Sequence, residues 1–166
     1  MANNHNYVIS DQDCQFMKMA CDLASENVDR GGGPFGAVIV KDGEVIAAAG
    51  NSVTFDNDPT AHAEVNAIRR ACSLTRSFKL DGCVVYCSCE PCPMCLSALY
   101  WAGISRIYYA NTTADADRIN FKDDFISKEL EKQHLERTIP CIHMKGTSAI
   151  ESFNKRASKE DKIEYK

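Results

Sequence analysis

Four residues in two short segments have the types and spacing of a catalytic metal site. His62 and Glu64 stand two positions apart, and Cys92 and Cys95 stand three positions apart. An imidazole nitrogen and two thiolates are good ligands for zinc, and at the start of a helix both sulfurs can face one point. The helix N-terminus and the metal both favour thiolate over thiol. Three protein ligands leave the fourth tetrahedral position open to water, which is the pattern of a catalytic zinc site.

Glu64 is placed to move protons beside such a metal. Zinc lowers the pKa of its bound water from about 15.7 to roughly 7, so hydroxide is available at neutral pH. A carboxylate two positions after a ligand can lie beside that water without binding the metal. It can take the water's proton, protonate a ring nitrogen and then protonate a leaving amine. We therefore expect one zinc ion per subunit, with a bound water or hydroxide, and hydrolysis at an electron-poor C–NH₂ carbon.

Several helices and strands must bring these side chains together. A polar loop is expected at 51–58. Apolar spacing and turn residues predict helices after Ser10, from 58–60 onward, and at 93–102, 123–131 and 148–159, and strands at 35–40, 45–49, 83–87, 104–110 and 139–144. This order predicts a three-layer α/β/α fold, with helices on both faces of a five-stranded mixed sheet. The later strand–helix–strand crossovers should make their strands parallel.

The composition limits the class of protein. The chain has 166 residues, nine cysteines and a formal charge of −4. This length predicts a single zinc domain over 1–166, and the negative charge argues against a nucleic-acid partner. No apolar run is long enough to span a bilayer, and the first residues carry no export signal. We expect a cytoplasmic protein without a membrane partner, whose crowded cysteines serve a metal rather than disulfides.

The motif His62-Ala63-Glu64, followed by Pro91-Cys92-Pro93-Met94-Cys95, resembles the signature of zinc deaminases in the cytidine-deaminase-like superfamily. Within that superfamily the chain most resembles the small bacterial guanine deaminases, over nearly its whole length. The segments that carry this resemblance are 32–43, 57–65, 88–96, 100–102, 125–126, 128–129 and 136–140. The resemblance implies the cytidine-deaminase-like fold, a zinc cofactor, and the conversion of guanine to xanthine and ammonia.

The resemblance also implies residues that contact the purine base. Asn51 falls where the family has an amide that hydrogen-bonds the purine. Phe35 falls where an aromatic ring packs against the base, and Trp101 matches an aromatic side chain in the pocket wall. These three residues are therefore expected to bind a small-molecule purine.

An acidic residue shortly before a Phe-Ile pair contacts the guanine edge in the family. Counting back from Phe125 makes Asp123 the match, with Asp124 as the alternative, whereas Lys122 departs from the family's pattern. Guanine presents N1–H and N2–H₂ as neighbouring donors, and a carboxylate can accept both. The other interpretation is that Asp123 only helps to begin a helix.

The end of the chain also matches the family. Tyr165 stands where relatives have an aromatic residue that closes over the site. In the family this tail exchanges between two subunits, so the resemblance implies a homodimer in which the segment from about 148 to 166 covers a partner's pocket. The alternative for so charge-rich a tail is disorder.

Three other functions remain open from the sequence. A guanosine deaminase would share the zinc chemistry, but its pocket must admit ribose. A transfer-RNA-specific adenosine deaminase needs a basic surface, and the tail supplies some basic residues: Lys155, Arg156, Lys159, Lys162 and Lys166. A non-catalytic zinc module is the third alternative, and Glu64 argues against it, because a structural site has no use for a carboxylate beside an open metal position.

Overall fold

The computed structural model describes residues 7–165, and the chain divides into two units, 1–123 and 124–166. The zinc ligands and Glu64 all belong to the first unit. The single domain over 1–166 stays a prediction. In the part of the chain that the structure describes, no helix is long and apolar enough to cross a membrane.

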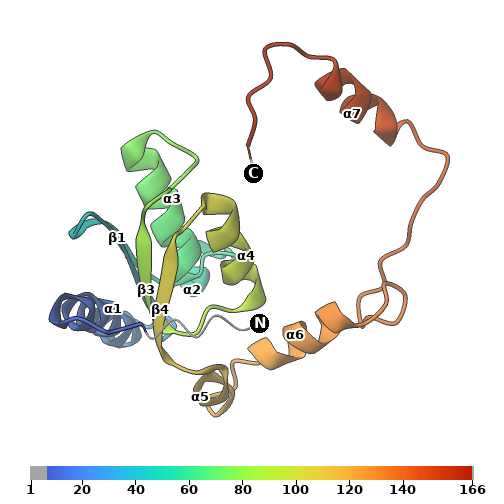
Figure 1. Ribbon diagram of the computed structural model, residues 1–166. Coiled ribbons are helices and arrows are strands. Elements are labelled where there is room, and N and C mark those ends of the chain that lie inside the picture. Colours follow the sequence, from blue (N-terminus) through green and yellow to red (C-terminus); the bar gives the residue numbers. More distant parts are fainter. Residues whose placement is uncertain (1–6, 166) are drawn as a thin grey trace. The chain divides into compact units, whose positions relative to one another are not determined.

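Four strands form one mixed sheet in the first unit (Figure 1). They are β1 Gly36–Lys41, β2 Glu44–Gly50, β3 Val84–Cys89 and β4 Arg106–Asn111, in the spatial order β2-β1-β3-β4. β1 runs antiparallel to β2 and β3, whereas β3 and β4 are parallel, as predicted for a crossover through a helix.

The prediction of a fifth strand is wrong, because residues 139–144 form no strand here. These residues lie in the second unit, whose described residues contain helices and no strand. An extended segment without neighbouring strands leaves its backbone groups unpaired, and isolated strand pairing is marginal in water. The apolar residues of 139–144 are compatible with a strand, but without a neighbouring strand to pair with they do not form one.

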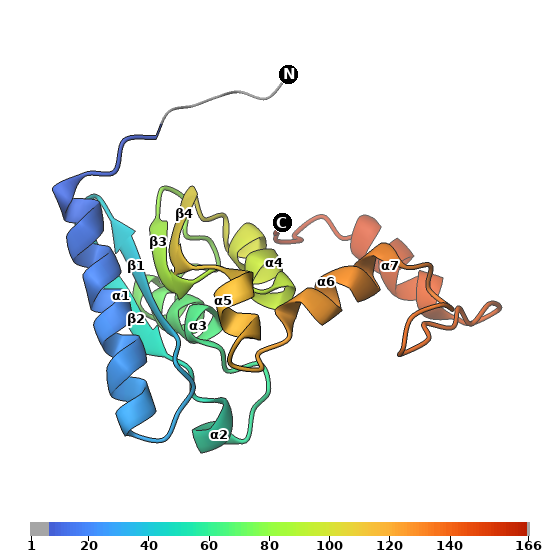
Figure 2. The same cartoon turned by 90° about the horizontal axis from the view of Figure 1, so that it is seen from below.

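Helices cover both faces of the sheet (Figure 2). α1 Asp11–Asp29 packs on β1 and β3, whereas α3 Ala63–Thr75 packs on β1 and β2 and contacts α4 Pro93–Ala102. Each face of the sheet carries a hydrophobic core, and β1 contributes side chains to both. Ala37 and Ile39 lie in the core under α3, and Val38 and Val40 lie in the core under α1. Side chains of a strand alternate between faces in this way. The predicted three-layer α/β/α arrangement is confirmed.

Two short helices were not predicted. α2 Val53–Asp56 lies inside the expected polar loop, and α5 Thr113–Asp117 follows β4. Each is too short for an apolar period to be read from the sequence. α5 does carry a capping box, in which Thr112 and Asp115 bond each other's backbone N–H groups.

α1 is fixed to the sheet at two places. Ser10 and Asp13 form a capping box at its start, and the Tyr86 hydroxyl of β3 donates to the Asp13 carboxylate at 2.5 Å. That hydrogen bond is the main reason why the pKa of Asp13 lies below its ordinary value. Farther along, α1 touches β1 so closely that a Cβ on Gly36 would lie 2.2 Å from the Ala20 carbonyl oxygen. Glycine at position 36 therefore lets the helix lie directly on the strand.

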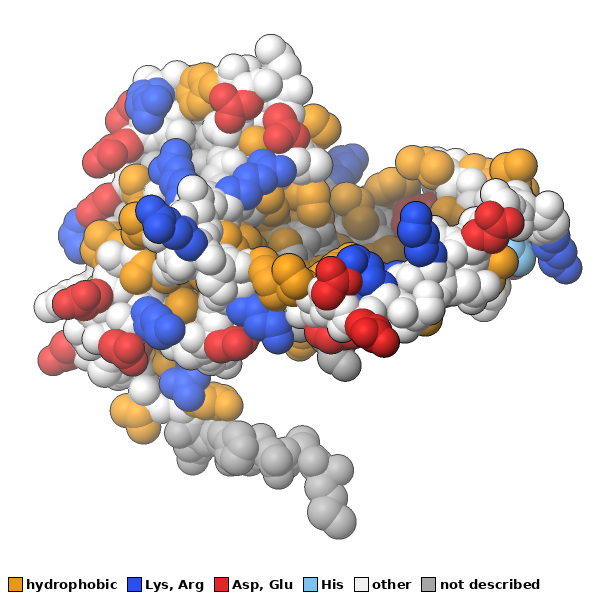
Figure 3. All heavy atoms as spheres, turned by 90° about the horizontal axis from the view of Figure 1, so that it is seen from above, with side chains coloured by type: hydrophobic (Ala, Val, Ile, Leu, Met, Phe, Trp, Pro, Cys, Tyr) orange, Lys and Arg blue, Asp and Glu red, His pale blue; other side chains and the backbone are white. Residues whose placement is uncertain are grey.

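The second unit has little core of its own. It contains α6 Asp123–Glu131, whose first residue belongs to the first unit, and α7 Ala149–Ala157, close to the predicted helices. None of the described residues in either helix is buried. Ile139, Ile142 and Met144 are 80%, 76% and 74% exposed. Hydrophobic side chains at the surface, beside charged ones, are visible in Figure 3. So much exposed apolar surface is typical of a segment that binds another protein surface.

Candidate active site

The predicted ligands stand at the beginnings of two helices. His62 is the N-cap of α3, and Cys92 is the N-cap of α4, which Pro93 begins. Proline suits a first helical position because its φ is already helical and its missing N–H is not needed there. Cys95 follows within the first turn of α4. The His62 Nδ1 atom lies 3.6 Å from the Cys92 sulfur and 3.5 Å from the Cys95 sulfur.

The geometry of these three residues fits zinc. Their ligand atoms all lie within 4.8 Å of one another. Zinc–sulfur bonds of about 2.3 Å and a zinc–nitrogen bond of about 2.0–2.1 Å, at a tetrahedral angle, put nitrogen and sulfur about 3.6 Å apart. The two nitrogen–sulfur distances, 3.6 and 3.5 Å, agree with this value. His62, Cys92 and Cys95 are thus able to hold a zinc ion, as the sequence predicts.

The electrostatics of the cluster favour a cation. A hydrogen bond from the Cys95 thiol, together with His62, lowers the pKa of Cys92 to about 4. Hydrogen bonding to that thiolate is also the main cause that raises the pKa of Cys95 and of His62. The N-termini of α3 and α4 favour negative charge at the same place. A divalent cation can therefore replace the protons that these ligands share.

Glu64 lies beside the ligand cluster and is not a member of it. Glu64 is only 7% exposed, and its Oε2 lies 3.4 Å from the Cys95 sulfur. Burial raises the pKa of this carboxyl. Because α3 carries both His62 and Glu64, the helix fixes the carboxyl relative to the ligands. A carboxyl held in this way can accept a proton near the metal and return it.

A cavity of about 230 Å³ opens over the cluster. Its lining combines the metal-site residues with the residues expected to bind a base. Among its walls are His62, Glu64, Cys92, Phe35, Asn51 and Asp123. The structure therefore brings together three of the five predicted substrate residues, although they come from separate parts of the chain.

Asn51 and Asp123 offer opposite hydrogen-bonding groups to this cavity. Asn51 is 6% exposed, and its Oδ1 accepts a hydrogen bond from the Val53 N–H at 3.2 Å, so the Nδ2 group is its donor. Burial, and then the nearby Cys92, raise the pKa of the Asp123 carboxyl. As a carboxylate, Asp123 can only accept hydrogen bonds. A donor and an acceptor in one small cavity can recognise the edges of a planar base.

The remaining predicted substrate residues lie elsewhere. Trp101 is on α4, 64% exposed, and does not line the cavity. Tyr165 belongs to the second unit, where the Arg156 guanidinium lies 5.4 Å from its ring centre. Their contacts with a substrate stay predictions. Asp124, the alternative to Asp123, pairs with Lys128 on α6 at 2.5 Å and does not line the cavity.

Phe121 is a cavity residue that the sequence analysis missed. Its ring meets the Phe35 ring edge to face, with centroids 4.8 Å apart and planes at 89°, and both rings line the cavity. Its position two residues before Asp123 could have suggested it. Val53 and Thr54 of α2 also line the cavity, but a single helical turn inside a polar loop gives no comparable signal.

Replacing either cysteine ligand should remove the metal. We expect Cys92→Ser and Cys95→Ser to weaken zinc affinity by more than about 100-fold, since even outer partners of metal ligands are worth 10–100-fold. Elemental analysis after dialysis against a chelator measures this loss. The matched control is Cys89→Ser, because Cys89 is buried nearby on β3 but lies outside the ligand cluster. Equal zinc retention by all three variants would contradict the ligand assignment.

Comparisons with known proteins agree with this geometry. Residues 10–111 match the family described as the cytidine and deoxycytidylate deaminase zinc-binding region. The chain is 51% identical over 151 residues to guanine deaminase of Bacillus subtilis (strain 168), which covers 90% of this chain and 97% of that relative. An X-ray structure of guanine deaminase from Bacillus subtilis matches with a TM-score of 0.89 and 51% identity, over 91% of this chain and 97% of that one.

Two other similarities are weaker. The chain is 43% identical over 95 residues to tRNA-specific adenosine deaminase of Aquifex aeolicus (strain VF5), over 57% of this chain and 63% of that relative. A structure of guanine deaminase from Nitrosomonas europaea matches with a TM-score of 0.64 and 28% identity, over 73% of this chain and 69% of that one. The chain therefore belongs to the zinc-binding cytidine and deoxycytidylate deaminase family.

Proposed function

We propose that this chain catalyses the hydrolytic deamination of guanine to xanthine and ammonia. The observation that carries the proposal is the presence of Asp123 in the same small cavity as Glu64 and the zinc ligands. The relative that matches over 90% of this chain, from Bacillus subtilis, is named a guanine deaminase. The cavity of about 230 Å³ is smaller than the roughly 300–1,000 Å³ of pockets for drug-sized ligands. A cavity of this size can hold a planar purine base.

The residues of the site supply the proton transfers of this reaction. Zinc, when bound, makes a water molecule acidic enough to act as a nucleophile at neutral pH. Glu64 takes a proton from that water and delivers it to N3 of guanine as the oxygen bonds to C2. Glu64 then moves the remaining hydroxyl proton to N2, the C2–N2 bond breaks, and ammonia leaves xanthine. Burial suits this carboxyl to both tasks, because its raised pKa favours holding a proton between the steps.

The cavity walls orient the base for this attack. The Asp123 carboxylate accepts hydrogen bonds from N1–H and N2–H₂, which are neighbouring donors on guanine. The Asn51 amide donates to an acceptor such as O6 or N7. Phe35 and Phe121 form an aromatic wall of the cavity, and such a wall packs against a planar base. Adenine and cytosine lack the donor pair that Asp123 recognises.

A substrate panel tests the proposed function directly. Zinc-loaded protein is incubated with guanine, guanosine, adenine, cytosine and a transfer-RNA anticodon stem-loop, and ammonia release is followed. We expect release from guanine alone, because the cavity fits a base and the formal charge of −4 does not favour RNA. Ammonia only from guanosine or from RNA would leave the zinc chemistry intact and overturn the substrate.

Glu64→Gln tests the proton transfers. The amide keeps the shape of the side chain but cannot accept a proton, so kcat should fall by about 10²-fold or more, the usual scale for general acid–base catalysis. Zinc content should stay at one per chain, because Glu64 is not a ligand. Steady-state kinetics with elemental analysis measures both quantities. Full activity in this variant would exclude the mechanism.

Asp123→Asn tests recognition of the donor pair. The amide can present an NH₂ group to guanine donors, which turns an attraction into a clash. We expect kcat/KM for guanine to fall by at least about 10-fold, because a buried hydrogen bond to a charged group is worth about 1.5–3 kcal/mol. Asp124→Asn is the matched control, since Asp124 does not line the cavity. Equal losses in the two variants would count against Asp123.

The second unit suggests how the protein assembles, and we propose a homodimer that exchanges its C-terminal segments. β4 lies at one end of the sheet, so one of its edges has no neighbouring strand among the described residues. α4 exposes Leu96, Tyr100 and Trp101. Residues 139–144, which are mostly apolar and exposed, could extend the sheet at β4 of a second copy. Tyr165 would then cover the partner's cavity.

Mixing two inactive variants distinguishes exchange from a tail that folds back on its own chain. Glu64→Gln and Tyr165→Ala homodimers should each have low activity. A mixed dimer formed by denaturing and refolding both variants together should regain activity, because the Tyr165→Ala chain keeps Glu64 and receives an intact tail from its partner. Light scattering gives the oligomeric state and ammonia release gives the activity. Dimers without any recovery would exclude the exchange.

A further inference from the structure

Asn27, near the end of α1, joins two backbone segments of the cavity wall. Its side chain is 6% exposed, and Nδ2 donates to the Gly33 carbonyl at 2.7 Å and to the Asn51 carbonyl at 2.8 Å. Both Gly33 and Asn51 line the cavity. Both hydrogens of the Asn27 amide are therefore used in these two bonds. They link Gly33, which precedes β1, to Asn51, which follows β2.

Two glycines make room for this amide. A Cβ on Gly32 would lie 2.4 Å from the Asn27 Nδ2, and a Cβ on Gly50 would lie 2.9 Å from its Oδ1. Neither glycine has a positive φ, so space and not backbone conformation accounts for glycine at these two positions. The Asn27 side chain thus occupies a fitted space between the two segments that it joins.

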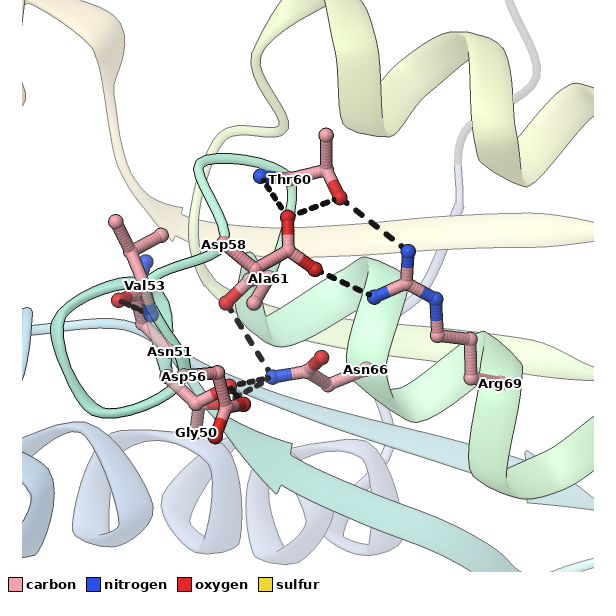
Figure 4. Close-up of polar contacts among 10 residues, drawn as sticks. Gly50, Asn51, Val53, Asp56, Asp58, Thr60, Ala61, Asn66 and Arg69 are labelled. Carbon is pink, nitrogen blue, oxygen red and sulfur yellow. Dashed lines mark hydrogen bonds and ion pairs between the residues drawn. The ribbon is translucent and has the colours of Figure 1, made fainter.

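Asn66 holds the same loop from the opposite helix. Its Nδ2 lies within hydrogen-bonding distance of the Gly50 carbonyl at 3.1 Å, the Ser52 hydroxyl at 2.8 Å and the Ala61 carbonyl at 3.3 Å (Figure 4). The backbone N–H of Ser52 also donates to Ala61 at 2.9 Å. Asn66 stands one turn after His62 on α3, and its own N–H donates to the His62 carbonyl. The amide therefore links the loop around Asn51 to the helix that carries the zinc ligand.

We infer that Asn27 and Asn66 are positioning residues, which clamp the backbone on either side of Asn51 and so aim its side chain at the base. The inference rests on the proposed role of Asn51 in binding the purine. The Asn51 oxygen is already bonded to the Val53 N–H, so the direction of its amide follows the backbone of this loop. A displacement of about 1 Å at such a group can cost about 10²-fold in rate. Neither Asn27 nor Asn66 lines the cavity itself.

The first test compares Asn27→Ala, Gly50→Ala and the double variant. Asn27→Ala removes the clamp, and Gly50→Ala pushes the Asn27 amide out of its space. We expect each to raise KM for guanine by about 10-fold or more, with a smaller change in kcat and one zinc per chain. The double variant should be no worse than the poorer single variant, because the Cβ at position 50 then meets no amide. Strictly multiplicative losses would overturn the inference.

A stability-matched control separates positioning from general weakening of the fold. Phe16→Leu alters a buried residue on the same helix, which packs on Tyr86 with ring centroids 5.3 Å apart and belongs to the core cluster of Ala20, Val38, Val40 and Tyr86. It should lower stability while leaving KM unchanged. If Asn27→Ala fails to fold, Gly50→Ala supplies the same comparison. A KM that rises equally in Phe16→Leu would overturn the inference.

Asn66→Ala extends the test to the second helix. Replacing Asn66 should raise KM by only a few-fold. Asn66 is half-buried, so water can replace some of the hydrogen bonds that its side chain makes. An unchanged KM in this variant would remove Asn66 from the clamp.

A readout without substrate keeps this inference distinct from the proposed function. In ¹⁵N-labelled, zinc-loaded protein, the Asn51 side-chain amide and the Val53 backbone amide should shift in Asn27→Ala and stay in place in Phe16→Leu. If the Asn51 and Val53 amide resonances stay in place in Asn27→Ala, the inference that Asn27 positions Asn51 is wrong. If the wild-type protein releases no ammonia from guanine, the proposed function fails, and these resonances still decide whether Asn27 positions Asn51.

Discussion

The meeting of two helix N-termini at one buried point is the constraint on which the rest of this structure depends. His62 is the N-cap of α3 and Cys92 is the N-cap of α4, so each predicted ligand stands immediately before its helix. α3 can approach the sheet closely because Ala63, Ala67 and Ala71 on its inner face are fully buried and small. If α3 or α4 began at another residue, or lay farther from the sheet, the His62 imidazole would be separated from the Cys92 and Cys95 sulfurs. The packing of the sheet and helices therefore fixes the positions of the N-termini of α3 and α4.

The same arrangement determines how charge is distributed in the cavity. Glu64 is in the first turn of α3, so the helix that supplies the imidazole also supplies the buried carboxyl. Cys92 favours the thiolate, whereas burial of Glu64 and Asp123 raises the pKa of both carboxyls. A metal cation can balance the thiolates while leaving the carboxyls free for protons and for the base. Binding and proton transfer can thus be assigned to different anionic groups that lie within one small cavity.

The sequence predicted best those elements whose ends are marked by local signals, such as a proline at the start of a helix or a glycine after its last residue. The helix at 93–102 has proline at its first position and glycine after its last, and the structure places α4 at Pro93–Ala102. The cluster of His62, Cys92 and Cys95 was predicted from residue type and spacing, and the structure brings these three residues together. α2 and Phe121 were missed because their place in the cavity depends on how separate loops pack. The strand predicted at 139–144 did not form, since a strand also requires an edge to pair with.

Zinc would join parts of the chain that are distant in sequence, because His62 caps the N-terminus of α3 and Cys92 caps that of α4, with β3 between the two helices. A metal that binds the folded chain and not the unfolded one adds its binding free energy to the stability of the fold. It acts as a cross-link across the intervening segment, but as a reversible one whose strength follows the concentration of free zinc. Metal supply should then govern the lifetime of the protein as well as its turnover. In a cell short of zinc, the amount of this protein would fall together with its activity.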